Sequence, residues 1–180
     1  MLNLIVPDAE YFDEINEEFI YKKEQALQLE HSLVSLSKWE SKWNKAFLGR
    51  REKTDEEILD YVRCMTLTQN VDPEVYSRLS SENYAAINAD IEAPMTATCF
   101  FDDKTARGNR ETVTSELIYY WMISYNIPVE FQKWHLNRLL TLIRVCDIKN
   151  TPPKKRSRRD IMNRHAAINA ANRQRFNSKG

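Results

Sequence analysis

Histidine and cysteine are the residue types through which this chain could bind a metal, and each of them occurs three times. His31, His135 and His165 lie far apart in the sequence, outside any H-x-x-x-H or H-E-x-x-H pattern. No C-x-x-C pair occurs either, so no set of ligands has the spacing of a zinc site. The sequence predicts no metal and no cofactor, and a site assembled from distant histidines is left open.

Covalent catalysis would need a serine or cysteine beside a base and an oxyanion hole. The G-x-S-x-G pattern of a nucleophile elbow does not occur, and the chain has only three glycines. Cys64 and Cys146 lie within apolar helical patterns, where a buried, unreactive thiol is usual. Phosphate-binding loops require glycines that this chain lacks. We therefore predict no catalytic residues and expect a protein that is not an enzyme.

Charge is distributed very unevenly along the chain, although 26 basic and 26 acidic residues give zero net charge. Residues 154–180 contain nine basic residues and one acid, so this tail carries +8 and residues 1–153 carry −8. The basic group Lys154, Lys155, Arg156, Arg158 and Arg159 could contact phosphates or an acidic protein. Because the tail has few aromatics to stack on bases, and the acidic body would repel a duplex, we favour a protein partner over nucleic acid.

Helical patterns dominate the chain after residue 36. Ser37 with Glu40, and Thr54 with Glu57, have the spacing of capping boxes and predict two helix starts. Pro73 fits the first turn of a short helix. Further helices are predicted from the sequences SSENYAAINADIEA, SELIYYWMISYN and VEFQKWHLNRLLTLIRVC, the second capped by Thr114 or Ser115.

Three large aromatic residues follow the first predicted helix start. Trp39, Trp43 and Phe47 are spaced at i, i+4 and i+8, which places them on one stripe of a helix. We predict that this stripe, together with the basic group of the tail, binds a partner. The alternative is that the three side chains pack on the protein's own core.

The segment YYWMISYNIPVEFQKWH, residues 119–135, is the most aromatic part of the chain. The weakly charged run around it, Leu117 to Val129, has 13 residues, whereas a membrane helix needs about 20 apolar ones. Its aromatics fall at helical spacings on either side of Pro128. We predict the core of a helical hairpin, with an exposed partner groove as the alternative and no contact with a membrane.

We therefore expect a mainly α fold, a compact multi-helix domain with small β elements. Residues 1–36 form a β-containing N-terminal segment with a hairpin, in which Leu27, Leu29, His31 and Leu33 share one face. Residues 37–150 form the helical core domain, interrupted by a hairpin or flap near residues 95–114. Residues 151–180 form a basic linker and a C-terminal helix or tail. The odd number of cysteines favours a reducing cytoplasm over a disulfide framework.

Several stretches carry a resemblance to a known family: SLSKWESKWNKAFLG, DYVRCMTLTQNVDPEVYSRL, INADIEAPMTAT, ELIYYWMISYNIPVEFQKWHLNRLLTLIRVC and KNTPPKK. They resemble small proteins encoded among the tail and virion-assembly genes of long-tailed bacteriophages, usually described as tail assembly chaperones. The resemblance covers most of residues 25–155 and includes no catalytic motif. It implies a protein that acts in virion morphogenesis in the host cell cytoplasm, binding the helix-rich tape measure protein and tail tube subunits.

Two other functions are left open, namely a structural virion protein of the tail or connector and a nucleic-acid-binding protein that uses the basic tail. The opposite charges of tail and body also predict self-association. If the basic tail of one copy contacts the acidic body of the next, the resulting oligomer is a ring or an open filament.

Overall fold

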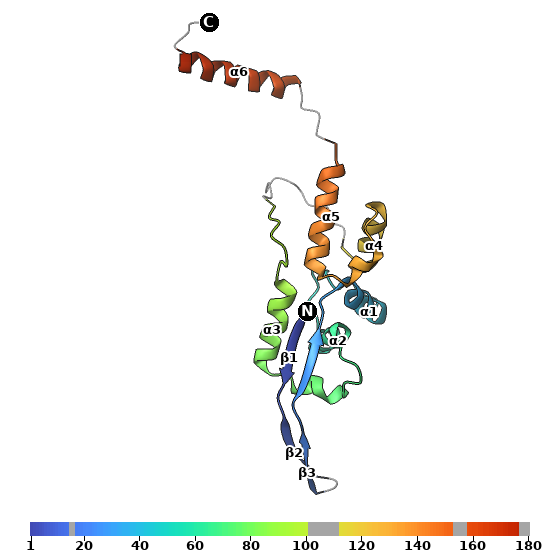
Figure 1. Ribbon diagram of the computed structural model, residues 1–180. Coiled ribbons are helices and arrows are strands. Elements are labelled where there is room, and N and C mark those ends of the chain that lie inside the picture. Colours follow the sequence, from blue (N-terminus) through green and yellow to red (C-terminus); the bar gives the residue numbers. More distant parts are fainter. Residues whose placement is uncertain (15–16, 101–111, 153–157, 177–180) are drawn as a thin grey trace. The chain divides into compact units, whose positions relative to one another are not determined.

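The computed structural model describes residues 1–14, 17–100, 112–152 and 158–176 (Figure 1). The chain divides into two compact units, Met1–Cys146 and Asp147–Gly180. The fold is mainly α-helical with small antiparallel β elements, which confirms the predicted fold class in its coarse form. The finer division into segments 1–36, 37–150 and 151–180 stays a prediction.

The N-terminal residues form one long antiparallel ribbon of four short strands. They are β1 (Leu2–Val6), β2 (Ala9–Asp13), β3 (Glu18–Lys22) and β4 (Gln25–Leu29). Strand β1 pairs with β4, and β2 pairs with β3 farther along the ribbon. Leu4 faces Leu27 in the first pair, and Phe12 faces Phe19 in the second. The predicted N-terminal β element is therefore present.

The predicted start of the first helix is wrong by about one turn. Helix α1 spans Leu33–Trp43, so Leu33 is helical and does not continue the strand. Its N-cap is Ser32, whose side chain accepts a hydrogen bond from the backbone N–H of Ser35, and the Ser35 side chain bonds back to the backbone N–H of Ser32. This capping box starts the helix five residues before Ser37, the predicted cap.

The next predicted helix starts are confirmed. Helix α2 spans Asp55–Met65 and has Thr54 as its N-cap, with Glu57 completing the capping box. The short 3₁₀ helix η1 (Pro73–Arg78) and helix α3 (Ser81–Glu92) follow. Helix α4 (Ser115–Ser124) is capped by Thr114.

The single long helix predicted after Pro128 is interrupted. A 3₁₀ helix, η2 (Val129–Lys133), comes first, and helix α5 (Leu136–Asn150) begins after an extended Trp134. The break has a tertiary cause, because His135 forms a β-bridge with Ser32 and the Leu136 N–H donates to the His31 carbonyl. These contacts fix the start of α5 beside the junction of β4 and α1.

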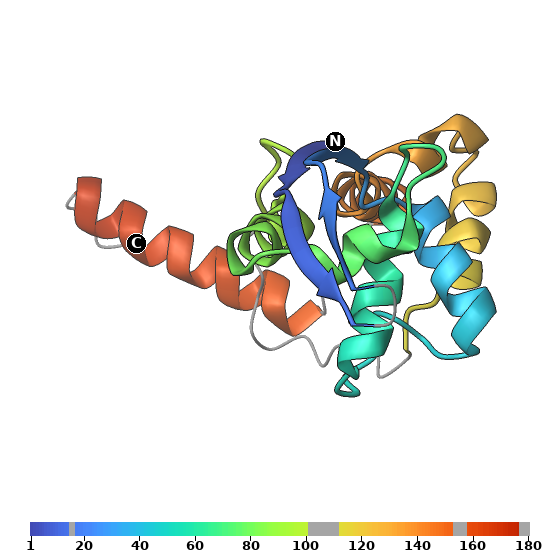
Figure 2. The same ribbon diagram turned by 90° about the horizontal axis from the view of Figure 1, so that it is seen from below.

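The core lies where one face of the β1–β4 pair meets the helices (Figures 1 and 2). Buried leucines and valines of the strands pack there with apolar side chains of α1, α2, α4 and α5. The core side chains include Leu4, Val6, Leu27, Leu29, Leu33, Leu36, Val62, Met65, Ile118, Leu136 and Leu139. The aromatic segment 119–135 contributes Tyr119, Trp121, Tyr125 and Phe131, all partly buried against this core, which agrees with the prediction of a packed rather than open segment.

The hairpin predicted near residues 95–114 is not seen where it can be checked. Residues 93–100 and 112–114 contain no strand, and the rest of the predicted hairpin lies outside the described residues. In the second unit, helix α6 spans Arg158–Phe176, where the sequence predicts a C-terminal helix or tail. Lys154, Lys155 and Arg156 lie outside the described residues. Over the part of the chain that the structure describes, no helix has both the length and the apolar character needed to cross a membrane.

Candidate functional site

The two tryptophans of the predicted partner-binding stripe connect α1 to α2. Trp39 is 1% exposed, and its Nε1–H donates to the Glu57 carbonyl at 2.8 Å. Trp43 is half-buried, and its Nε1–H donates to Asp60 Oδ2 at 2.8 Å. Both indoles therefore contribute to the helix interface, and Trp39 has no surface to offer a partner. Partner binding by Trp43 stays a prediction.

Phe47 joins these aromatics although it is not part of the helix. Helix α1 ends at Trp43, and Asn44 adopts the left-handed conformation with φ 52° while its N–H donates to the Glu40 carbonyl. The chain turns back, so the Phe47 ring lies 5.1 Å from that of Trp39 and stacks at 3.8 Å on that of Tyr61. The predicted grouping is present, and its three rings pack against the protein's own core.

Glu40, on α1, bonds to the backbone at two distant places in the sequence. Its Oε1 accepts from the Phe47 N–H at 2.9 Å, and its Oε2 accepts from the Ser115 N–H at 2.7 Å, at the start of α4. An open cavity of about 300 Å³ lies beside it, bordered also by Lys45 and Glu116. Because both carboxylate oxygens already accept backbone hydrogen bonds, this buried acid serves as an N-terminal cap of α4.

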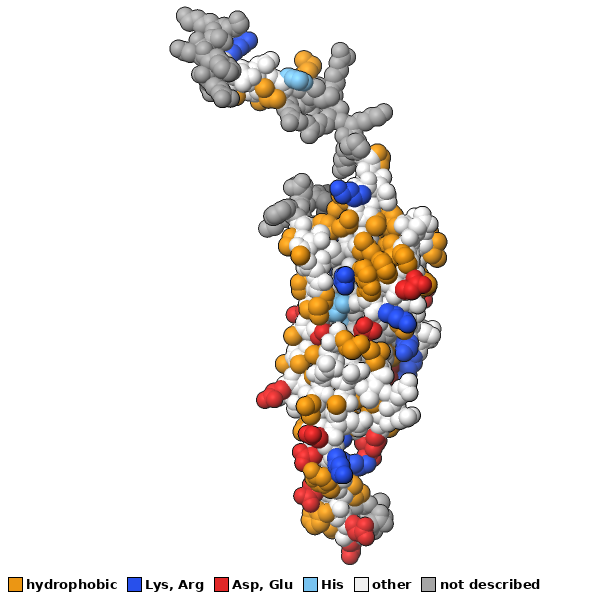
Figure 3. Space-filling model, in the orientation of Figure 1, with side chains coloured by type: hydrophobic (Ala, Val, Ile, Leu, Met, Phe, Trp, Pro, Cys, Tyr) orange, Lys and Arg blue, Asp and Glu red, His pale blue; other side chains and the backbone are white. Residues whose placement is uncertain are grey.

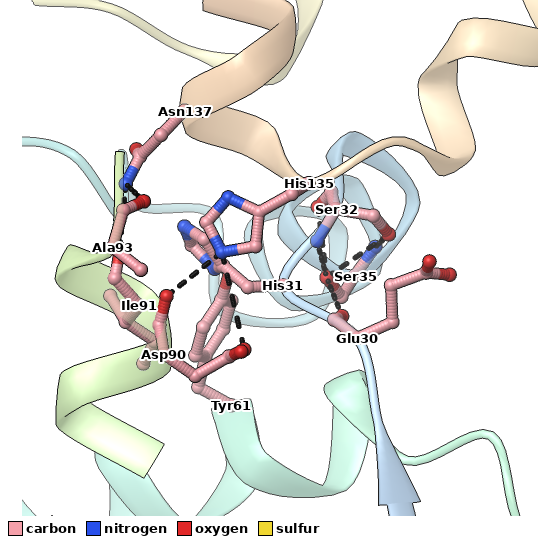
Figure 4. Close-up of polar contacts among 10 residues, drawn as sticks. All are labelled: Glu30, His31, Ser32, Ser35, Tyr61, Asp90, Ile91, Ala93, His135 and Asn137. Atoms are coloured by element: carbon pink, nitrogen blue, oxygen red, sulfur yellow. Dashed lines mark hydrogen bonds and ion pairs between the residues drawn. The ribbon is translucent and has the colours of Figure 1, made fainter. Parts of the chain in front are cut away.

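Two histidines separated by more than 100 residues meet in a buried polar cluster (Figure 4). The rings of His31 and His135 are 5.1 Å apart and edge to face. His31 Nδ1 lies 2.6 Å from the Tyr61 hydroxyl, and His135 Nε2 lies 2.8 Å from the Asp90 carbonyl. A carbonyl can only accept, so His135 carries its proton on Nε2. No spacing in the sequence indicates this pair, because tertiary packing alone brings it together.

The hydrogen bonds of this cluster hold elements of the fold together. His135 bonds the Asp90 carbonyl, and Asn137 Nδ2 donates to the carbonyls of Ile91 and Ala93 at 2.8 and 2.9 Å, so the start of α5 caps the end of α3. Burial, and then the adjacent His135, lower the pKa of His31 to about 4. Among the described residues, no three or more histidine, cysteine or acidic side chains are arranged to hold a metal ion.

A group of exposed aromatic residues lies elsewhere, on the β2–β3 end of the ribbon. One face of this end is anchored by η1. The Tyr11 hydroxyl donates to Glu74 Oε2 at 3.1 Å, and Lys22 Nζ lies 3.2 Å from Asp72 Oδ2 and 2.9 Å from Glu74 Oε2. Arg78 also donates to the carbonyls of Pro7 and Lys23, where the ribbon passes from β1–β4 to β2–β3.

The opposite face carries Phe12, Phe19 and Tyr21, which we call the aromatic face. Their side chains are 48%, 72% and 59% exposed. Phe12 and Phe19 are directly opposite across the strands, with ring centroids 5.1 Å apart. The Tyr21 hydroxyl donates to Asp8 Oδ2 at 2.7 Å, and this hydrogen bond raises the pKa of Tyr21. Strand alternation puts the three rings on the side away from η1.

Acidic residues surround the aromatic face. Residues 8–24 contain seven acids and two lysines, a net charge of −5. The space-filling view shows hydrophobic and acidic side chains interspersed over β2 and β3 (Figure 3). An exposed aromatic cluster with a polar rim is the composition of a protein-binding surface. The sequence signal for it is EYFD followed by EFIYK, two aromatic pairs in an acidic hairpin, which the sequence reasoning did not single out.

Comparisons with family models, curated proteins and solved structures found no match to this chain. A function for this chain is therefore inferred from its residues and their geometry, together with the resemblance of its sequence.

Proposed function

We propose that this protein is a non-enzymatic tail assembly chaperone that binds polypeptide clients through its aromatic face in the host cytoplasm. The client that the sequence resemblance suggests is the tape measure protein, with tail tube subunits as a second one. The observation that carries the proposal is the exposure of Phe12, Phe19 and Tyr21 on a hairpin that is held in place from its other side.

The anchoring by η1 supports binding because it organises the aromatic face in advance. A free two-stranded hairpin is marginally stable in water. Here Tyr11, Lys22 and Arg78 connect β2, β3 and the strand junctions to the domain. A surface that is already ordered loses little conformational entropy when a client binds, and more of the contact energy appears as affinity.

The acidic rim defines the chemistry of the client. It favours a segment with an apolar face for the rings and with lysine or arginine at its borders. An amphipathic helix meets this description, since residues at i, i+3, i+4 and i+7 form one apolar face. Long-range attraction to the net charge of −5 on residues 8–24 would speed the encounter with such a client.

The test is a co-expression and pull-down experiment with the tape measure protein from the same gene cluster. We expect the wild-type chain to recover the client, and the double variant Phe12→Ser/Phe19→Ser to lose it. Ile123→Ser is the matched control, because Ile123 is 76% exposed on α4 and lies outside the hairpin. Equal recovery by the double variant and the control would contradict the proposal.

Two further measurements distinguish this function from the two others. A structural virion protein is present in purified particles in a fixed copy number, whereas a chaperone is absent from them. A nucleic-acid-binding protein has an affinity for DNA or RNA that falls steeply with salt and depends on the basic tail.

A further inference from the structure

We propose that the aromatic face also binds helix α6 of a second copy, so that copies associate head to tail when no client is present. This inference shares with the proposed function only the aromatic face as the binding surface. It names a partner that the chain itself supplies, and it can be tested without any client.

Charge complementarity is the first argument. Residues 158–176, which form α6, contain five arginines and one aspartate, a net charge of +4, against −5 on residues 8–24. Arginine is well suited to this surface, since its planar guanidinium group can pair with carboxylates and stack on aromatic rings. The chain already makes such a contact, because the Arg138 guanidinium lies 4.0 Å from the centre of the Trp134 ring.

The exposed side chains of α6 are the second argument. Every described side chain of this helix is exposed, including Met162 at 66% and Ile168 at 45%. Alanines at positions 166, 167, 170 and 171 are small enough to let flat rings approach the helix closely. The helix therefore combines apolar surface with positive charge, and this combination is complementary to an aromatic face bordered by acidic residues.

The length of the chain favours binding of α6 from a second copy over binding of α6 from the same chain. Helix α5 begins beside the Leu29 end of the ribbon, where the Leu136 N–H donates to the His31 carbonyl. Within the first unit, α5 and the β2–β3 end of the ribbon extend in opposite directions (Figure 1).

From Leu29 back to Phe19 the ribbon is roughly 35 Å long, and α5, Leu136–Asn150, is about 22 Å long. The seven residues 151–157 span at most about 25 Å. A returning tail would therefore bring only the C-terminal end of its own α6 near Phe19.

The consequence is an assembly that can grow. A contact between two different surfaces of identical chains repeats in every copy, and it forms a ring or an open chain. A client that occupies the aromatic face would displace α6 and release the copies. Self-association would then protect the aromatic rings from water until a client arrives.

Photo-crosslinking of the full-length chain tests the contact. Benzoylphenylalanine replaces Phe19. Protein labelled with ¹⁴N and protein labelled with ¹⁵N are each treated with nuclease, mixed, and then irradiated. We expect crosslinks to residues 158–176 with mixed isotopes. Crosslinks with one isotope only would show binding to the same chain. That result, crosslinks to other regions, or no crosslink would each overturn the proposal.

Sedimentation measured over a range of protein concentrations provides the second readout. We expect Phe12→Ser/Phe19→Ser, and separately Arg164→Glu/Arg173→Glu, to weaken self-association at least tenfold, and Ile123→Ser to leave it unchanged. Wild-type protein that stays monomeric at low salt would overturn the inference, as would association that nuclease abolishes. Because no client is present, failure here leaves the pull-down result intact, and failure of the pull-down leaves this result intact.

Discussion

Buried His31 and Glu40 show how single polar side chains position the elements of this fold. Glu40 accepts hydrogen bonds from two backbone N–H groups, and His31 pairs with the Tyr61 hydroxyl inside the core. Both side chains are buried. The contribution of His31 to stability depends on its protonation state, and that of Glu40 depends on its having two hydrogen-bond acceptors. Each therefore leads to a prediction about the free energy of unfolding.

The first prediction concerns pH. The pKa of His31 is about 4 in the folded protein, against 6.5 for an exposed histidine, so the unfolded chain binds this proton first. The stability contributed by neutral His31 is complete above pH 6.5 and is lost as pH falls from 6.5 to 4. The full loss is about 3 kcal/mol. Urea unfolding of wild-type protein and of His31→Gln, between pH 4 and pH 7.5, measures the difference.

The control for this experiment is His165→Gln, since His165 is exposed on α6. We expect the control to follow the wild-type pH dependence, and His31→Gln to show a smaller fall in stability between pH 6.5 and 4. Identical slopes for wild-type protein and His31→Gln would show that His31 does not titrate in this way.

The second prediction concerns Glu40. Glu40→Gln keeps the size of the side chain but turns an NH₂ group toward one of two backbone N–H donors. A buried donor then lacks an acceptor, which costs about 1–3 kcal/mol of unfolding free energy. Glu82→Gln, an exposed acid in the first turn of α3, should cost less than about 1 kcal/mol. Comparable losses in both variants would contradict the capping role of Glu40.

At the level of single residues, the sequence predicted neighbours better than it predicted exposure. The spacing of Trp39, Trp43 and Phe47 correctly indicates that the three rings group together. It cannot show that Phe47 follows a left-handed Asn44, or that Tyr61 stacks on it from another helix. Periodicity defines a face, but whether that face meets the core or a partner depends on elements that are distant in sequence.

At the level of elements, the helix starts marked by capping residues were the most predictable feature. Thr54 with Glu57, and Thr114, begin helices as expected because the signal is local. The start of α1 was missed, since Ser35 completes a capping box that the S-x-x-E pattern does not include. The break before α5 was also missed, because it depends on the pairing of His135 with Ser32.

Which rings of β2 and β3 are exposed could not be predicted from the sequence, for a related reason. Tyr11 and Phe12 are adjacent aromatics of β2 that point to opposite faces, so they look equivalent in the sequence. The structure separates them, because η1 contacts only one face of the ribbon. Which side is open is therefore decided by a helix about 50 residues farther along the chain.

The third prediction is that the two ends of the ribbon differ in their importance for stability. Leu27 is fully buried between β1 and the helices, so Leu27→Ala should cost about 2–5 kcal/mol. Phe12→Ser/Phe19→Ser removes an exposed pair and should cost about 1 kcal/mol. Guanidinium unfolding measures both. A loss of several kcal/mol in the hairpin variant would mean that its rings serve the fold.

At the level of the whole molecule, opposite charges on the body and the tail suggest that electrostatics controls encounter rates. Exposed charges are largely screened beyond a Debye length, which is about 10 Å at 0.1 M salt and about 3 Å at 1 M. Residues 8–24, with a net charge of −5, should attract a basic client from a distance only at low salt. Short-range contacts with the rings do not depend on salt in this way.

The fourth prediction follows for the rate of client binding. The association rate constant should fall roughly tenfold or more between 50 mM and 500 mM salt, while the dissociation rate constant changes much less. Stopped-flow fluorescence with a labelled tape measure fragment measures both constants. A dissociation rate that carries most of the salt dependence would contradict steering by the acidic rim.

We propose that this protein acts by binding other polypeptides through Phe12, Phe19 and Tyr21. A calorimetric titration of tape measure protein with wild-type chain, Phe12→Ser/Phe19→Ser and Ile123→Ser tests this claim. Because aromatic anchors each contribute about 2 kcal/mol or more at an interface, the double variant should lose about 4 kcal/mol and bind roughly 1,000-fold more weakly. The control should match wild type. Wild-type affinity in the double variant would contradict the claim.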